Sequence, residues 1–180
     1  MIFIGIDPGL SGGVAMLSAN KLETFKMPTM KQGRRNNVDV RALSYLIGHT
    51  LDVLFDSTQE DCFVVIESAQ KFSAGTNALT STWFGFGRIL AMLELEQWAH
   101  EVIESPRTWQ GQFWKRPKLP KGQKFNTKEA SVNAAARLWP KHDFRPIGKS
   151  GRRVTTGVDG LTDAALLAEY ARRLGRRKML

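Results

Sequence analysis

The spacing of apolar and polar residues predicts that the chain begins with strands. Residues 2–7 are almost wholly apolar up to Asp7, which is typical of a strand buried on both faces. A glycine-rich turn at residues 8–13 leads into an apolar run at 14–17, and residues 22–27 alternate like a half-exposed strand. We therefore expect a three-stranded meander.

Helical and extended patterns follow this meander. Residues 31–37 are polar and predict a mobile loop, whereas residues 39–55 carry apolar positions at helical spacing. Residues 62–66 form a second apolar run, which ends at Glu67. This run is typical of another buried strand.

The second half of the chain adds helices on either side of one more strand. We expect, in order, a helix over residues 78–100, a short strand over 102–105, a helix over 127–138, a loop over 148–157 and a final helix from about 160 to 174. Residues 126–129 resemble a capping box at a helix start. No internal repeat or linker appears, so we predict one α/β domain over residues 1–180, with a mixed five-stranded sheet flanked by helices.

The positive charge of the chain is concentrated in one segment. The 180 residues include 26 Lys and Arg and 17 Asp and Glu, for a net charge of +9 and a pI near 10.0. Residues 107–153 alone hold 13 basic residues and two acids, so the rest of the chain is slightly acidic. Such a local excess favours a surface that meets a polyanion, although a solvated, solubilising face is the alternative.

Other sequence features indicate a cytoplasmic protein. No run of eighteen apolar residues predicts a membrane span, and the first residues predict a strand in place of a signal peptide. Cys62 is the only cysteine, so an internal disulfide is excluded and a thiolate zinc site is disfavoured.

Four acids lie where the predicted elements begin or end. Asp7 and Glu67 end the two most apolar strands, and Asp159 and Asp163 lie four apart at the start of the last helix, on one face of it. Ligands gather beyond the carboxyl ends of parallel strands in open α/β sheets. If the two strands pair in parallel, all four carboxylates can meet there.

A cluster of carboxylates needs a cation or a proton. Two carboxylates about 4 Å apart repel by roughly 4 kcal/mol at an effective dielectric near 20. Hard oxygen ligands without His or Cys suit Mg²⁺ or Mn²⁺ better than Zn²⁺. Two such ions roughly 4 Å apart would clamp the attacking water and the leaving oxygen of a phosphodiester.

Each acid also has a purely structural interpretation. Asp7 before Pro-Gly can cap a turn, and Asp159 can cap the last helix. Asp163 can be a first-turn surface acid, whereas Glu67 after a buried run calls for a partner. The glycines of residues 9–13 lack the Gly-Lys-Ser/Thr ending of a phosphate-binding loop.

The ordered motifs resemble one known family. Residues 5–9 (Gly-Ile-Asp-Pro-Gly), 65–67 (Val-Ile-Glu), 127–131 (Thr-Lys-Glu-Ala-Ser) and 159–165 (Asp-Gly-Leu-Thr-Asp-Ala-Ala) resemble, in this order, motifs of the RuvC-type Holliday junction resolvases, especially phage-encoded members. The resemblance implies a ribonuclease-H-like fold, a homodimer, Mg²⁺ or Mn²⁺ dependence, and paired nicks in opposing strands of a four-way DNA junction.

The resemblance also implies roles for individual residues. It carries Asp7, Glu67 and Asp163 over as metal-binding acids, and Asp159 with them, although Gly160 stands where some members place the fourth acid. Lys128 matches one family lysine near the scissile phosphate. Gln110 stands where the other is expected, and Lys115 is a candidate replacement. The nucleic-acid contacts that we expect fall on Arg34, Arg35, Phe72, Lys115, Lys118, Lys121 and Lys124, with Phe72 either stacking in an opened junction or lying in the core.

Three alternatives to a junction resolvase stay open. A nuclease of the same fold that acts on flaps, RNA–DNA hybrids or structured RNA would use the same acids. A non-catalytic module that binds branched DNA would keep them as structural groups. An actin-like ATPase or sugar kinase shares the Asp-x-Gly turn but needs two such domains and about twice this length.

Overall fold

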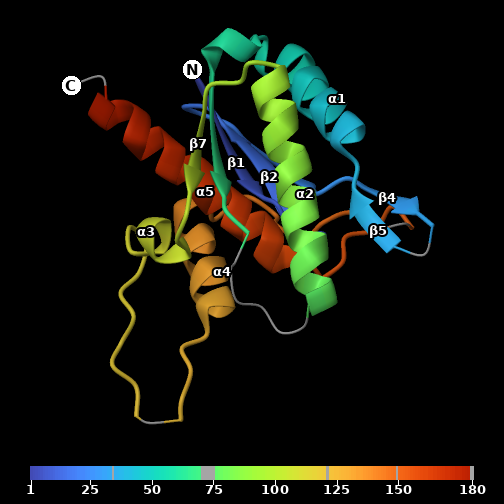
Figure 1. The fold of residues 1–180 in the computed structure, drawn as a ribbon. Helices are drawn as coiled ribbons and strands as arrows, with labels where there is room; N and C mark the ends of the chain where they lie inside the picture. Colours follow the sequence, from blue (N-terminus) through green and yellow to red (C-terminus); the bar gives the residue numbers. More distant parts are fainter. Residues whose placement is uncertain (34, 70–75, 121, 149, 179–180) are drawn as a thin grey trace.

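The computed structural model describes residues 1–33, 35–69, 76–120, 122–148 and 150–178. Its centre is a five-stranded sheet in the order β3-β2-β1-β6-β7 (Figure 1). The strands are β1 (Ile2–Asp7), β2 (Gly13–Leu17), β3 (Leu22–Lys26), β6 (Cys62–Glu67) and β7 (His100–Ile103). β1 to β3 form an antiparallel meander, while β6 pairs in parallel with β1 and β7. The predicted mixed α/β sheet is confirmed.

Helices cover both faces of this sheet. They are α1 (Val40–Thr50), α2 (Thr76–Leu95), α3 (Pro106–Gln110), α4 (Thr127–Leu138) and α5 (Val158–Lys178). Because side chains alternate along a strand, Ile4 and Ile6 of β1 pack in the core beneath α1 and α2, whereas Phe3 packs in the core beneath α5. Two apolar layers therefore enclose the sheet.

Helix α5 lies almost directly on β1. A Cβ atom at Gly5 would come within 2.1 Å of the backbone oxygen of Ala164 and 2.3 Å of the backbone nitrogen of Ala168. Glycine on the strand and small residues on the helix allow this approach. The N-terminal turns of α5 are thereby held at the carboxyl end of β1.

The prediction of a mobile loop over residues 31–37 is wrong. β4 (Thr29–Gln32) and β5 (Arg35–Val38) form a two-stranded antiparallel hairpin beside α2 (Figure 1). The hairpin is mostly exposed and is joined by backbone pairing, so it has no apolar period for a sequence pattern to show.

The predicted helix over residues 78–100 is too long at its C-terminal end. α2 stops at Leu95, and Gln97 takes a left-handed conformation with φ of 59°. This turn brings Trp98 into the core and lets β7 start at His100, two residues before the predicted strand. The pairing with β6, not the apolar run, sets the bounds of β7.

The remaining helices differ from the sequence predictions in detail. The helix over 39–55 is present as α1 and a π-helical turn at Leu51–Phe55, and Asn126 caps α4 by accepting from the backbone N–H of Glu129. α5 begins two residues earlier than predicted and ends at Lys178. The five-residue helix α3, which the sequence analysis missed, follows β7 directly.

Candidate metal-binding acidic site

Asp7 and Glu67 end neighbouring parallel strands. The register of β1 and β6 pairs Ile6 with Ile66, and each acid is the next residue of its strand. Parallel strands bring their carboxyl ends to the same edge of a sheet. The two strand-end acids are therefore neighbours at one edge.

The last helix brings its acids to this same edge. Gly160 in the first turn of α5 touches the turn between β1 and β2, because a Cβ there would lie 2.3 Å from the backbone oxygen of Ser11. Asp159 and Asp163 flank this contact on the helix. The turn after Asp7 and the start of α5 are thus packed against each other.

The surroundings of Asp163 strongly disfavour a negative charge on its carboxyl group. Burial of its carboxyl group and the charges of Asp7, Glu67 and Asp159 raise its pKa, a hydrogen bond from Ser131 lowers it, and the resulting pKa is about 8. Its Oδ1 atom is buried and has no hydrogen-bond partner among the described residues. A buried carboxyl oxygen without a partner is costly unless a proton or a cation satisfies it.

Asp7 is perturbed in the same direction. Burial and the charge of Asp159 raise its pKa, the backbone N–H of Gly9 and the charge of Lys128 lower it, and the resulting pKa is about 6. The mutual effects of Asp7, Asp159 and Asp163 arise only over short distances. Because the charge of Glu67 also acts on Asp163, the acids of β1, β6 and α5 converge on one acidic site.

Lys128 neutralises part of this site. Its Nζ lies 2.6 Å from Oδ2 of Asp159, although the lysine side chain is 76% exposed. This hydrogen bond is the main reason that the pKa of Lys128 is raised and that of Asp159 lowered. Since Lys128 lies in the first turn of α4 and Asp159 in the first turn of α5, the ion pair joins the two helix N-termini.

The donor set fits a hard divalent cation. All four acids offer oxygen ligands, and the unpartnered Oδ1 of Asp163 can accept a cation. As their side chains are placed, the described residues contain no group of three His, Cys, Asp or Glu that could hold one metal ion. Ligation would therefore require the side chains to rotate, with Asp159 turning away from Lys128.

Trp109 is a residue of this site that the sequence analysis missed. It is fully buried in α3, and its indole Nε1 donates a 2.6 Å hydrogen bond to Oε2 of Glu67. The one indication of it in the sequence was that Glu67, at the end of a buried strand, needs a hydrogen-bond partner. The short helix that supplies this partner has too few residues to show a period.

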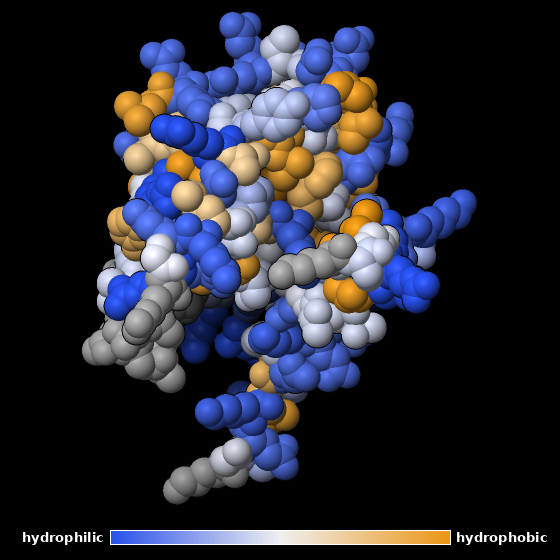
Figure 2. Space-filling view, turned by 90° about the vertical axis from the view of Figure 1, so that its right-hand side faces the viewer, coloured by the Kyte–Doolittle hydropathy of each residue, from blue (hydrophilic) through white to orange (hydrophobic). Residues whose placement is uncertain are grey.

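The expected nucleic-acid contacts lie on two projections. Arg35 is exposed on the β4–β5 hairpin. Lys115, Lys118 and Lys124 are exposed on an arm, described over residues 111–120 and 122–126, that lies between α3 and α4 and extends below the body of the protein (Figure 1). The described part of the arm is mostly hydrophilic (Figure 2). Arg34, Phe72 and Lys121 lie outside the described residues.

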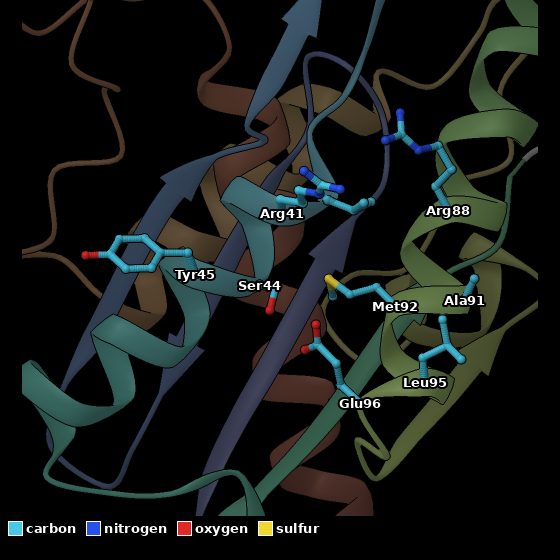
Figure 3. Close-up of a pocket in the computed structure, with 9 residues that line it drawn as sticks. Arg41, Ser44, Tyr45, Arg88, Ala91, Met92, Leu95 and Glu96 are labelled. Carbon is cyan, nitrogen blue, oxygen red and sulfur yellow. The ribbon is translucent and has the colours of Figure 1, made fainter.

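A shallow groove on another part of the surface is separate from the acids. Helices α1 and α2 line this hollow of about 650 Å³, and none of the four acids contributes to it. Figure 3 shows Met92 of α2 extending toward α1, where Ser44 lies, whereas the Tyr45 side chain points away from α2. The groove is mainly apolar and carries no cluster of carboxylates, so it is not the candidate catalytic site.

Two solved structures have a similar arrangement of elements. Thermus thermophilus RuvC in complex with a Holliday junction substrate matches with a TM-score of 0.52 and 16% sequence identity, covering 96% of each chain. A second Thermus thermophilus RuvC structure matches with a TM-score of 0.51 and 18% identity, also over 96% of each chain. The chain has a RuvC-like fold. The α/β sheet and RuvC-like fold predicted from the sequence are thereby confirmed.

Similarity to the RuvC structures is not accompanied by a sequence match. No family model matches the chain, and no curated protein matches it. At 16–18% identity the RuvC likeness shows the fold alone. Separately, none of the helices in the described ranges is both long enough and apolar enough to cross a membrane.

Proposed function

We propose that the chain is a divalent-metal-dependent endonuclease that resolves four-way DNA junctions by paired, symmetric nicks. The observation that carries this proposal is the environment of Asp163. Its carboxyl group is buried with an unpartnered oxygen and lies within the electrostatic reach of Asp7, Glu67 and Asp159. Perturbed acids that converge from separate elements are typical of catalytic sites.

Asp7, Glu67, Asp159 and Asp163 would hold the metal. An oxygen-only donor set favours Mg²⁺, with Mn²⁺ as a substitute, and the charge of four carboxylates suits two ions. When bound, such ions activate water and stabilise the charge that develops on a phosphodiester. Residues 1–180 would form one nuclease domain.

Other residues would position these acids and the DNA. The Trp109 indole fixes the rotamer of Glu67, and the Ser131 hydroxyl orients Asp163. The exposed ammonium of Lys128 stands at the acids and would contact the phosphate being cut. Each of these groups acts through a hydrogen bond or a charge already present in the fold.

The basic projections would bind the DNA backbone. The expected contacts are Arg35, Lys115, Lys118 and Lys124, together with Arg34, Phe72 and Lys121. One RuvC neighbour of the same fold is in complex with a Holliday junction substrate, which supports branched DNA as the ligand. A homodimer would match two active sites to a two-fold symmetric junction.

The decisive experiment is cleavage of an end-labelled four-way junction in Mg²⁺. Wild-type protein should nick opposing strands symmetrically, and Asp7→Asn should bind the junction without cutting it. Asp52→Asn, which removes an exposed acid on the π-helical turn, is the matched control and should cut normally.

The same assay separates the alternatives. Faster cutting of a flap, an RNA–DNA hybrid or structured RNA than of the junction would move the proposal to another nuclease of this fold. Junction binding without nicking over a range of Mg²⁺ and Mn²⁺ concentrations would favour a non-catalytic module. Full activity of Asp7→Asn would contradict the assignment of the site.

A further inference from the structure

A second hollow lies at the base of the arm, next to α3, the helix whose Trp109 bonds to Glu67. It has a volume of about 300 Å³ and is lined by Arg107, Gln110, Gly111, Trp114, Lys115 and Arg116. These residues come from α3 and from the first residues of the arm. We call this hollow the arm-base pocket.

The arm-base pocket is cationic and has no acid in its lining. Arg107, Lys115 and Arg116 contribute three positive charges. Within the described ranges, none of these three side chains forms an ion pair with a carboxylate, and Nη2 of Arg116 donates a 2.6 Å hydrogen bond to Oε1 of Gln110. Like charges that share a small hollow repel one another, and an anion offsets this repulsion.

The wall of the pocket is built on buried groups. Gln110, which holds the Arg116 guanidinium, is 8% exposed. Trp114 packs edge-on against Trp109, with ring centroids 5.8 Å apart. Arg173 from α5 stacks over Phe113 and donates to the backbone oxygen of Gln112. The base of the arm is therefore fixed to the body, so the pocket is preorganised.

We propose that the arm-base pocket binds one backbone phosphate of the DNA strand that is cut. This inference rests on the proposed nuclease function and deepens it. Guanidinium groups pair with two phosphate oxygens at once, and the pocket offers two of them with a lysine. Trp109, which holds Glu67, lies between Arg107 and Gln110 on the five-residue helix α3. A phosphate held here would stand in a fixed register with the acids.

The test is equilibrium binding of a fluorescent four-way junction in EDTA, where cleavage does not interfere. The variants are Arg107→Gln, Arg116→Gln and the double variant. Lys21→Gln is the charge control, because Lys21 lies in the turn between β2 and β3, at the edge of the sheet opposite β7 and α3. Dissociation constants are measured across a range of salt concentrations, with melting temperatures as the check on folding.

A single phosphate contact makes a specific prediction about salt dependence. Each of the two single variants should bind the junction more weakly than wild type. The plot of log K against log salt should become less steep by about 0.9, which corresponds to the loss of one phosphate contact. The double variant should add little to that change, because both arginines serve the same phosphate. Lys21→Gln should leave the slope unchanged.

Other outcomes would contradict the proposed phosphate site. Wild-type slopes in Arg107→Gln and Arg116→Gln, or a fully additive loss in the double variant, would mean that no shared phosphate site exists. Wild-type cleavage with Mg²⁺, measured in parallel, keeps the two proposals apart. If the wild-type protein cuts the junction but the two arginine variants keep wild-type salt slopes, only the phosphate-pocket proposal is contradicted. If the variants have reduced slopes but the wild-type protein does not cut, only the nuclease proposal is contradicted.

Discussion

The indole Nε1 of Trp109 lies 2.6 Å from Oε2 of Glu67, and the two residues are 42 positions apart in the chain. This bond joins a fully buried aromatic residue to an acid at the end of a central strand. Hydrogen bonds to charged groups contribute about 1.5–3 kcal/mol to stability. Trp109 therefore ties the short helix α3 to the acidic site.

Trp109→Phe should lower both stability and metal affinity. Phenylalanine keeps an aromatic ring but removes the donor, so Glu67 loses the group that orients it. We expect a loss of about 2 kcal/mol in the free energy of unfolding, and a shift of the Mg²⁺ dependence to concentrations about 10-fold higher. Denaturant unfolding and Mg²⁺ titration of cleavage measure these effects.

Trp114→Phe is the matched control for this variant. Its indole nitrogen is buried without a hydrogen-bond partner in the described part of the chain, so its removal breaks no bond. The Mg²⁺ dependence of Trp114→Phe should match that of wild type. Equal metal shifts in the two variants would count against a positioning role for Trp109.

Asp163 should make the metal-free protein less stable as the pH rises. Its pKa is about 8 in the folded chain against 3.8 ordinarily, so the native state binds the proton more tightly than the unfolded state. The stabilisation is complete below the unfolded pKa and is lost as the pH rises through about 8. Each unit of difference in pKa corresponds to about 1.4 kcal/mol.

The Asp163→Asn variant tests this linkage. Asp7, whose pKa is about 6, contributes the same sign, so the window between pH 6 and 8 isolates Asp163. In EDTA, wild-type unfolding free energy should fall across this window, and that of Asp163→Asn should stay nearly level. An equally steep fall in the variant would show that another group titrates.

Lys128→Gln should reduce activity much more than stability. Exposed ion pairs such as Lys128–Asp159 contribute at most about 1 kcal/mol, but a cation at the phosphate acts on the transition state. We expect a fall of about 100-fold in the rate of junction cleavage, with partial recovery in Lys128→Arg. A wild-type rate in Lys128→Gln would assign the lysine a purely structural role.

Gly160→Ala should separate the last helix from the β1–β2 turn. The added Cβ would lie 2.3 Å from the backbone oxygen of Ser11, so the helix start must shift. Overpacking of this kind costs about 1–3 kcal/mol, and it moves Asp159 and Asp163 relative to Asp7. We expect a lower melting temperature and slower cleavage.

Gly87→Ala is the control for the glycine substitution. Gly87 is exposed in α2, and a Cβ there meets no atom within 4 Å. Alanine favours the helix by about 1 kcal/mol relative to glycine, so this variant should be as stable as wild type or more so. Destabilisation by both variants would mean that the contact at Ser11 is not the cause.

The sequence alone determined the class of fold and the positions of the acids on its elements. A buried strand appears as an apolar run, and an acid that ends such a run is visible without knowledge of any partner. The strands ending at Asp7 and Glu67 and the helix start around Asp159 were therefore predictable from local patterns, although their metal-binding role stays a prediction.

Only the tertiary structure decided which groups these acids meet. Trp109 reaches Glu67 and Lys128 reaches Asp159 from elements far away in the chain, and no local period encodes such pairs. The β4–β5 hairpin was missed for a related reason, since backbone pairing between exposed polar segments leaves no mark in the hydrophobic pattern. Burial and long-range contacts shift the pKa values of the carboxyl groups, and both arise only when the helices pack on the sheet.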